Sequence, residues 1–303
     1  MRHFISMRDI NREELSAIIE DACRLKRERA SGILTRPLEG RTLAMIFEKA
    51  STRTRISFEV GMFELGGHAL FLNPRDMQLG RGEEIRDASR VLSRYVSCVM
   101  IRAYRHSNIE EYARHSSIPV INGLSDQEHP CQILADLMTI RELFGSMEGV
   151  RVAWIGDGNN VCRSLILAAP LAGIDLRIAS PPGYAPPVEL IEEARRGGAD
   201  VRLADTPKEA VRDADIIYTD VWVSMGDEEE RDARLKAFRG YTVTADLLDT
   251  ASPHVAVMHC LPAHRGEEIE DAVIEGEKSA VWMQAENRLH TEKALLLFLV
   301  EKT

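Results

Sequence analysis

Short apolar runs alternate with amphipathic helical patterns along almost the whole chain. In the first half, the runs that predict strands cover residues 42–47, 68–72, 97–101 and 119–122. In the second half they cover residues 150–156, 175–180, 200–204, 214–221 and 255–261. Strands that alternate with helices in this way form parallel sheets whose two faces are covered by helices. The sequence therefore predicts an α/β fold.

Two sets of this kind lie on either side of residues 126–149, and a chain of 303 residues is long enough for two domains. Within that stretch the apolar residues recur at helical spacing, and Pro130 suits the first helical turn. We expect two doubly wound domains, each a parallel sheet flanked by helices, joined by interdomain helices. The expected domains are 1–132 and 133–285, with a C-terminal helix, 286–303, that packs back on the first.

Charge and cysteine content argue against several classes of function. The formal net charge is -10, whereas a nucleic-acid-binding protein normally carries a basic stripe. The five cysteines are scattered without a CxxC pair, which fits a reducing cytoplasm and offers no metal-ligand spacing. The N-terminal residues contain no apolar signal-peptide core, and no apolar run approaches the ~18 residues of a membrane span. We expect a cytoplasmic protein with no metal, no cofactor, no nucleic acid and no membrane partner.

The stretch "STRTR", residues 51–55, follows the predicted strand 42–47 and precedes a helical pattern. The first backbone N–H groups of a helix have no partner inside the helix, and their dipoles favour negative charge. The hydroxyls of Ser51 and Thr52 and the guanidinium of Arg53 would complete a cradle for a phosphate group. The alternative is a simple N-cap with solvated arginines, and this stretch alone leaves both open.

Other polar residues lie where predicted strands end or helices begin. Arg102 follows the strand 97–101, His129 and Gln132 flank a helix start, and His259 and Cys260 end the strand 255–261. In open α/β sheets ligands bind just beyond the carboxyl ends of the strands. A lone histidine or cysteine at such a place is more often structural, but together these residues indicate a binding site.

The segment "WIGDGNN", residues 154–160, supports a rival function. Gly156 and Gly158 after a strand resemble the start of a dinucleotide-binding fingerprint, but the third glycine is missing because Val161 follows Asn160. A nicotinamide-dependent dehydrogenase is therefore the alternative from another reaction class. Elsewhere, Trp154 and Trp282 are expected in the core, and "DEEERDARLK" (227–236) is expected to be a solvated helix face.

Several longer motifs together resemble the ornithine carbamoyltransferases. They are "STRTR" (51–55), "MQLGRGE" (77–83), "NGLSDQEHPCQILADL" (122–137), "WIGDGNN" (154–160), "DVWVSMG" (220–226), "HCLPAHRGEEI" (259–269) and "AENRLHTEKALL" (285–296). The resemblance runs from near residue 8 to the end, with the motifs in order. "STRTR" and "HPCQ" alone would indicate only the wider carbamoyltransferase family, whereas the "SMG" and "HCLP" segments indicate ornithine.

The resemblance implies transfer of the carbamoyl group of carbamoyl phosphate to the δ-amine of L-ornithine, which gives L-citrulline and phosphate, a step of arginine biosynthesis or of the urea-cycle type. It implies a carbamoyl phosphate-binding domain followed by an ornithine-binding domain. It also implies a homo-oligomer, with a trimer as the expected form. The sequence leaves open whether the reaction serves arginine synthesis or citrulline breakdown.

The resemblance also implies roles for individual residues. Those implied for carbamoyl phosphate are Ser51, Thr52, Arg53, Thr54, Gln78, Arg102, His129, Pro130, Cys131, Gln132, Cys260, Leu261 and Arg288. Those implied for ornithine are Asn160, Asp220, Ser224 and Met225. Those implied in catalysis are Arg102, His129, Gln132, Asp220 and Cys260. Gln78 would reach the phosphate across a subunit interface.

Two further alternatives remain within this family. One is a non-catalytic relative kept as a binding or structural subunit, although the expected residue set has no gap. The other is a sister enzyme that carbamoylates putrescine or N-acetylornithine, although Asp220 and the "SMG" segment favour ornithine.

Overall fold

The computed structural model describes residues 1–73, 75, 77, 82–223 and 228–300, and for Glu228 the backbone alone. By its internal contacts the chain divides into two units, Met1–Met138 with Glu286–Thr303, and Thr139–Ala285. The first division falls inside helix α5 (Pro130–Phe144), and the second inside helix α12 (Val281–Val300). The sequence placed its first boundary in the same helix, after Gln132.

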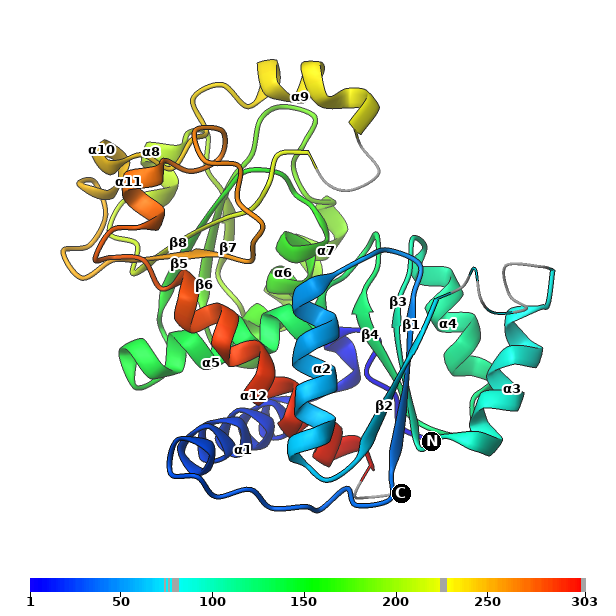
Figure 1. Cartoon of the computed structure of the whole chain (residues 1–303). Helices are drawn as coiled ribbons and strands as arrows, with labels where there is room; N and C mark the ends of the chain where they lie inside the picture. The colour runs from blue at the N-terminus through cyan, green and yellow to red at the C-terminus, as the bar shows by residue number, and fades with distance from the viewer. Residues whose placement is uncertain (74, 76, 78–81, 224–227, 301–303) are drawn as a thin grey trace. The chain divides into compact units, whose positions relative to one another are not determined.

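The first unit contains a four-stranded parallel sheet in the order β2-β1-β3-β4. Its strands are β1 (Thr42–Phe47), β2 (His68–Leu72), β3 (Cys98–Arg102) and β4 (Val120–Leu124). Its helices are α1 (Arg12–Ala30), α2 (Thr52–Glu64), α3 (Ile85–Tyr95), α4 (His106–His115) and the parts of α5 and α12 named above. Helix α2 lies on one face of the sheet, and α3 and α4 lie on the other (Figure 1).

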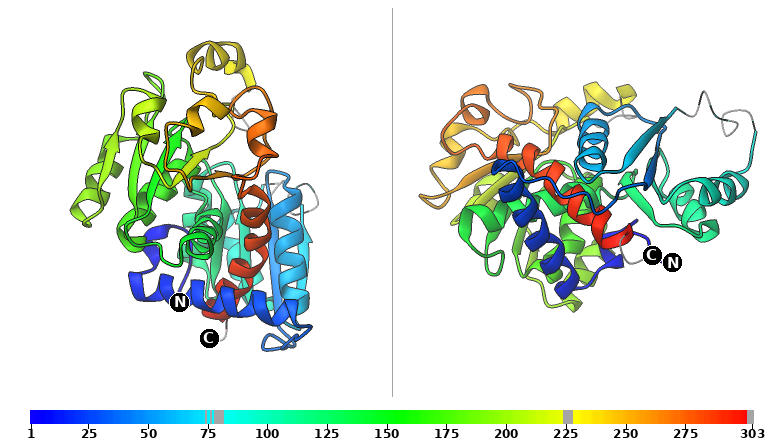
Figure 2. Two further views of the ribbon diagram at one scale, coloured as in Figure 1. Left: turned by 90° about the vertical axis from the view of Figure 1, so that its left-hand side faces the viewer. Right: turned by 60° about the horizontal axis from the view of Figure 1, so that its bottom comes forward.

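The core of the first unit follows from the alternation of side chains along the strands. Ala44 and Ile46 of β1 pack with Ile101 of β3 against Ala88 of α3 and Ile109 of α4. Helix α12 crosses α1 (Figures 1 and 2), and Lys26 Nζ on α1 donates to Asn287 Oδ1 on α12 at 2.8 Å. The C-terminal helix thus belongs to the unit formed by the start of the chain.

The second unit contains a five-stranded parallel sheet in the order β7-β6-β5-β8-β9. Its strands are β5 (Arg151–Ile155), β6 (Asp175–Ala179), β7 (Val201–Leu203), β8 (Ile216–Thr219) and β9 (Ala256–His259). Its helices are α6 (Asn160–Ala172), α7 (Val188–Arg196), α8 (Pro207–Val211), α9 (Arg231–Ala237), α10 (Ala245–Leu248) and α11 (Asp271–Ile274). Helices α6 and α7 cover one face, and α8, α10 and α11 cover the other (Figure 1).

Both sheets confirm the predicted doubly wound α/β fold, because each is parallel and carries helices on both faces. No helix among the residues that the structure describes is long and apolar enough to cross a membrane. Trp154 is buried as expected, but Trp282 at the start of α12 is 53% exposed, so its assignment to the core was wrong.

In each sheet the chain adds strands first on one side of its first strand and then on the other, which leaves one reversal point in the strand order. In the first unit this point lies between β1 and β3, and in the second it lies between β5 and β8. Loops that leave the carboxyl ends of these strand pairs diverge and leave a crevice for ligands. The loops that follow these strands are therefore the expected place for functional residues.

Candidate active site

The "STRTR" segment begins helix α2, as predicted. Ser51 is the N-cap residue, with extended backbone, and its Oγ accepts from the backbone N–H of Thr54 at 3.3 Å. The first turn of the helix contains no acidic residue. Ser51 and Arg53 are half-buried and Thr52 is exposed, whereas Thr54 is buried. The helix start is therefore capped, and it combines accessible hydroxyls with a guanidinium, as an anion site requires.

Arg288 on α12 holds two of the predicted site residues in place. Its Nη1 donates to Gln132 Oε1 at 2.9 Å, and its Nη2 donates to Thr54 Oγ1 at 3.3 Å. Its Nε donates to Glu292 Oε1 at 2.9 Å, and Nη2 donates to the same oxygen at 2.5 Å. Gln132 in turn donates from Nε2 to Asp136 Oδ1 at 2.8 Å. The Gln132 amide is thus fixed at both ends.

His129 lies immediately before α5 and is 5% exposed. Burial lowers the pKa of its imidazole well below the usual value, and the charges of Arg288, Arg102 and Arg53 lower the pKa further. The ring is consequently neutral at neutral pH and can donate one hydrogen bond from one nitrogen. Three arginines thus act on one histidine, and their charges favour its neutral form.

Arg102 is the last residue of β3 and is buried. The β3–β4 register shifts next to it, because Ile101 pairs with Asn122 whereas Arg102 pairs with Leu124. The skipped residue is Gly123, where an added Cβ would lie 2.4 Å from Met100 Sδ. Bulges of this kind redirect side chains at the ends of strands. A larger residue at position 123 would require the Met100 side chain to move.

Two further predicted residues contribute through the start of α5. Pro130 is its first residue, and Cys131 is fully buried with its Sγ donating to Asn122 O at 3.3 Å. Any contact of Cys131 with a ligand would have to come from its backbone. Gln78 lies outside the described residues.

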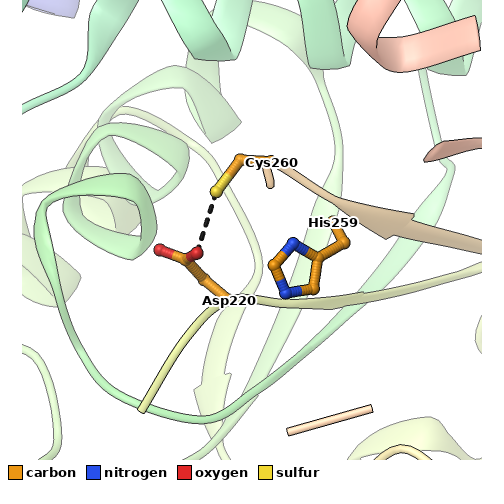
Figure 3. A group of neighbouring side chains, drawn as sticks. All are labelled: Asp220, His259 and Cys260. Atoms are coloured by element: carbon orange, nitrogen blue, oxygen red, sulfur yellow. Dashed lines mark hydrogen bonds between the residues drawn. The ribbon is translucent and has the colours of Figure 1, made fainter. Parts of the chain in front are cut away.

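In the second unit, Asp220 follows β8 and is fixed by two neighbours. Its Oδ2 accepts from Asn159 Nδ2 at 2.7 Å, and its Oδ1 accepts from Cys260 Sγ at 2.9 Å. Figure 3 shows the Cys260 thiol pointing at the Asp220 carboxylate. Each carboxylate oxygen has a second lone pair, so Asp220 can still accept from an ammonium or amine. Asn159 follows β5, so this pair spans the reversal point of the sheet.

Sequence reasoning named Asn160 but missed Asn159. Asn159 is the N-cap of α6, and its Oδ1 accepts from Val161 N at 3.0 Å and from Cys162 N at 3.1 Å. Asn160 is the first residue of the helix and is half-buried. An asparagine directly before a helix is a standard N-cap signal, so the cap was predictable. The contact with Asp220 was not, because it joins residues far apart in the sequence.

The same cap argues against dinucleotide binding. The helix start already has an acceptor from the chain itself, and Gly158 N donates to Tyr184 O at 2.8 Å. A Cβ added at Gly158 would lie 2.2 Å from Pro186 N, so the chain's own backbone occupies the close approach that a pyrophosphate would need. The glycines of this turn pack the loop rather than hold a nucleotide.

The loop that carries Cys260 and Leu261 folds around His259. Leu261 has φ +60 and donates its backbone N–H to His259 Nδ1 at 2.8 Å. His259 Nε2 lies 3.1 Å from Glu268 Oε1, and both side chains are fully buried. Because Nδ1 accepts a backbone N–H, the ring proton is on Nε2. The left-handed backbone at Leu261, unusual for a residue with a branched side chain, is stabilised by this contact.

Asp220, His259 and Cys260 each offer one ligand atom, all within 4.8 Å of one another, in the arrangement of Figure 3. A metal ion needs a free lone pair on the imidazole. In His259 the Nδ1 lone pair accepts from Leu261, and Nε2 faces Glu268. The histidine therefore does not offer a free lone pair in this arrangement.

The solvated helix face expected at 227–236 is exposed at residues 229–233 and at Lys236, but Arg234 on α9 is an exception. Its side chain is buried, and Nη1 donates to Asp157 Oδ2 at 2.8 Å and to Trp222 O at 3.0 Å. Its bond to Trp222 links the chain before and after residues 224–227. Those residues, which include the predicted Ser224 and Met225, lie outside the described residues.

Comparisons with known proteins agree along the whole chain. Residues 2–142 match the family model "Aspartate/ornithine carbamoyltransferase, carbamoyl-P binding domain", and residues 148–299 match "Aspartate/ornithine carbamoyltransferase, Asp/Orn binding domain". An ornithine carbamoyltransferase of Methanoculleus marisnigri is 60% identical over 99% of this chain and 97% of its own. One from Pseudomonas aeruginosa, named anabolic, is 54% identical over 99% of this chain and 98% of its own.

Solved structures give the same answer. The ornithine carbamoyltransferase of Pyrococcus furiosus has a TM-score of 0.96 and 51% identity, over 100% of this chain and 98% of that one. The anabolic enzyme of Campylobacter jejuni has a TM-score of 0.94 and 41% identity, over 100% of both chains. With both family models matched in order and relatives of this similarity over its full length, the chain belongs to the aspartate/ornithine carbamoyltransferase family.

Proposed function

We propose that the protein is an ornithine carbamoyltransferase, which transfers the carbamoyl group of carbamoyl phosphate to the δ-amine of L-ornithine and gives L-citrulline and phosphate. The observation that carries the proposal is the high identity, over the whole chain, with proteins of that name. The relative named anabolic supports a place in arginine biosynthesis.

The first unit holds carbamoyl phosphate in this proposal. Ser51, Thr52 and Arg53 at the start of α2 bind the phosphate, with Thr54 beside them. Arg102 and His129 direct N–H groups at the carbamoyl oxygen, on which negative charge grows as the amine adds. A donor aimed at such an oxygen typically contributes about 2.7–4 kcal/mol to lowering the barrier. His129 serves as a neutral donor, since burial and the nearby arginines lower its pKa.

Gln132 and Arg288 have more limited roles. Arg288 uses four of the five N–H donors of a guanidinium on Glu292, Gln132 and Thr54. One Nη1–H remains for carbamoyl phosphate, so the main contribution of Arg288 is to orient the side chains of Gln132 and Thr54.

Pro130 and Cys131 act through the backbone at the start of α5. Gln78 contributes from a neighbouring subunit.

The second unit holds ornithine in this proposal, through Asn160, Asp220, Ser224 and Met225. Asp220 accepts from an amine of the substrate, and Asn159 and Cys260 keep its carboxylate in place. Cys260 and Leu261 are assigned to carbamoyl phosphate from the family resemblance. Cys260 is not a nucleophile here, because direct attack by the amine needs no covalent intermediate.

The chemistry constrains the pH dependence. The δ-nitrogen attacks the carbamoyl carbon, the bond to the phosphate oxygen breaks, and the departing phosphate takes the proton that the nitrogen loses. An alkylammonium has a pKa of about 10.4, so only a small fraction of free ornithine can attack at neutral pH. The value of kcat/KM for ornithine should therefore rise with pH across the neutral range. A profile that is flat from acid to alkaline pH would contradict this route.

We also propose a homo-oligomer, with a trimer as the expected form, that works in the cytoplasm. Strand β2 lies at an edge of its sheet and exposes Leu70 and Phe71, and Ile56 and Phe63 on α2 are exposed as well. Exposed apolar side chains beside an open strand edge are typical of subunit interfaces. All five cysteines are free thiols, as expected in a reducing compartment. Light scattering after size exclusion measures the mass of the assembly, and a monomer would contradict the proposal.

The test of function mixes the protein with carbamoyl phosphate and, separately, L-ornithine, putrescine, N-acetylornithine or aspartate. Carbamoylated product and phosphate are measured for the wild type, for Arg53→Ala, and for Arg24→Ala as a matched control. Arg24 lies on the exposed side of α1 and pairs with Asp21 and Glu28.

Each outcome supports one candidate function and rejects the others. Citrulline from ornithine alone, lost in Arg53→Ala and kept in Arg24→Ala, would support both the reaction and the phosphate site. Turnover of another amine would keep carbamoyl transfer but reject ornithine as the acceptor. A folded protein that turns over none of the four amines would be the non-catalytic relative.

A further inference from the structure

The N-terminal residues lie along the last strand of the first unit. Phe4 pairs with Ile121 in a parallel bridge, its N–H donates to Val120 O at 2.8 Å, and its carbonyl accepts from Asn122 N at 2.9 Å. Asn122 Nδ2 also donates to Ile5 O at 2.9 Å. Residues 4–9, here called the N-terminal arm, thus extend the open edge of β4 toward the loop that follows it.

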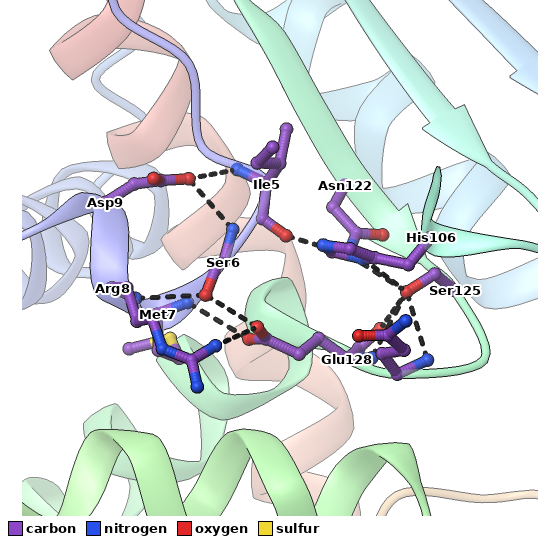
Figure 4. A network of polar contacts seen from close by, with 10 residues as sticks. Ile5, Ser6, Met7, Arg8, Asp9, His106, Asn122, Ser125 and Glu128 are labelled. Carbon is purple, nitrogen blue, oxygen red and sulfur yellow. Dashed lines mark hydrogen bonds and ion pairs between the residues drawn. The ribbon is translucent and has the colours of Figure 1, made fainter. Parts of the chain in front are cut away.

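Glu128 joins this arm to the loop. Its side chain is 4% exposed, and Oε1 accepts from Ser6 Oγ at 2.6 Å while Oε2 accepts from Met7 N at 3.1 Å. Arg8 Nη1 lies 3.6 Å from Oε1. Figure 4 shows the Glu128 carboxylate facing the turn of the arm. Asp9 Oδ2 accepts hydrogen bonds from Ile5 N and Ser6 N in the same turn.

The loop between β4 and α5 is itself tightly bonded. Ser125 Oγ accepts from Glu128 N at 3.1 Å and lies 2.8 Å from His106 Nδ1, and Ser125 N donates to Glu128 O at 2.9 Å. His129 is the next residue, and its carbonyl accepts from Gln132 N at 3.0 Å as α5 begins. The side chain of Glu128 is therefore anchored one residue before the histidine.

We propose that Glu128 is a positioning residue for His129, which it holds in place by tying the loop to the N-terminal arm. The proposal rests on the carbamoyl-holding role proposed above for His129. Glu128 itself does not touch the substrate in this proposal. It fixes the peptide on the N-terminal side of His129, and the first turn of α5 fixes the other side.

The chemistry of the contact favours a role in positioning over one in stability alone. Burying a carboxylate is costly, and an apolar residue would often stabilise a core as well or better. Burial raises the pKa of Glu128, while the bonds from Ser6 and Met7 and the charges of His106 and Arg8 oppose that rise. What a carboxylate adds is two acceptors on one rigid group, and these match the Ser6 hydroxyl and the Met7 N–H.

The test compares Glu128→Ala with Glu128→Gln. The alanine variant loses both hydrogen bonds with the arm and the ion pair with Arg8. The glutamine variant loses only the ion pair, because its oxygen can accept from Met7 while its amide donates to Ser6 Oγ. The matched control is Glu14→Gln, since Glu14 also binds a backbone amide, Asn11 N at 3.0 Å, and an arginine, Arg2 Nη2 at 2.5 Å, but at the start of α1.

Two readouts are needed. The first is kcat and both KM values well below the melting temperature. We expect Glu128→Ala to lower kcat about tenfold or more and to leave the KM for ornithine unchanged at saturating carbamoyl phosphate, because misplacing a catalytic group is costly. The second is the NMR signal of the His129 ring, assigned by its loss in His129→Asn, which should shift in Glu128→Ala but not in Glu128→Gln.

The proposal would be overturned if Glu128→Ala kept kcat within about twofold of Glu14→Gln, or if kcat fell while the His129 signal stayed in place. Should Glu128→Ala fail to fold, Ser6→Ala removes one of the two contacts and should give a smaller change of the same kind in both readouts. A wild type without carbamoyl transfer would refute the proposed function, and the His129 signal would still decide whether Glu128 positions the ring.

Discussion

Replacing Arg288 by Met is expected to destabilise the first unit by about 3–5 kcal/mol, because it removes the cation beside a buried carboxylate. Arg288 is 3% exposed and Glu292 is 1% exposed, so water cannot take over the role of the guanidinium. The variant also leaves Gln132 Oε1 and Thr54 Oγ1 without their donor. Adding Glu292→Gln removes the stranded charge and should restore about 1–3 kcal/mol.

The pH dependence of this variant has a definite sign. Burial raises the pKa of Glu292 even beside Arg288. Without Arg288 the folded protein binds a proton at Glu292 more tightly than the unfolded chain does, whose carboxyl has a pKa of about 4.3. The stability lost in Arg288→Met should therefore shrink as the pH falls toward that value and grow as the pH rises.

The assay must follow the first unit. The three tryptophans, Trp154, Trp222 and Trp282, all lie in the second unit, so their fluorescence does not directly report on the first. Hydrogen exchange of peptides from α2 and α12 reports on the first unit in the wild type, both single variants and the double variant. A coupling below about 0.5 kcal/mol between the two substitutions would refute the account of Arg288 and Glu292 as an ion pair on which the site depends.

Three further predictions concern single residues. Asn159→Ser keeps an N-cap oxygen but cannot reach Asp220, so the KM for ornithine should rise about tenfold with little change in melting temperature. Asn159→Ala should raise the KM as well and should also lower the free energy of unfolding, measured by denaturation, by about 1 kcal/mol. Gly158→Ala places a Cβ 2.2 Å from Pro186 N and should destabilise the second unit by about 1–3 kcal/mol, measured by tryptophan fluorescence in denaturant. The ring of His129 should stay neutral from pH 8 to well below pH 6.5 in an NMR titration, because burial and three arginines lower its pKa.

The sequence predicted the fold well because the local signals agree with one another. All nine predicted strands are present, and their ends differ by at most two residues, as at β8, where the prediction covered 214–221 and the strand is Ile216–Thr219. The start of α2 at Ser51 and of α5 at Pro130 also followed from local rules. Capping and apolar spacing are encoded within a few residues, so they can be read without knowing the tertiary structure.

The residues that sequence reasoning missed depend on distant partners. Arg234 looked solvated in a charged run, but its partner Asp157 lies 77 positions earlier. Asn159 was overlooked in favour of Asn160 because its bond to Asp220 crosses 61 positions. Trp282 looked like a core residue by type alone, although the first turn of α12 leaves it exposed. Long-range contacts decided each case, and no local pattern carries that information.

The two units share one physical arrangement, and it explains which residues a motif reveals. In each unit the group with the relevant chemistry is held by a second side chain that comes from another element. Arg288 on α12 fixes Gln132 and Thr54, and Asn159 before α6 fixes Asp220. Fixing these groups before the ligand binds lowers the entropy that binding must overcome. Motifs find the groups that act, whereas the residues that orient them become visible only when their partners are brought together by the fold.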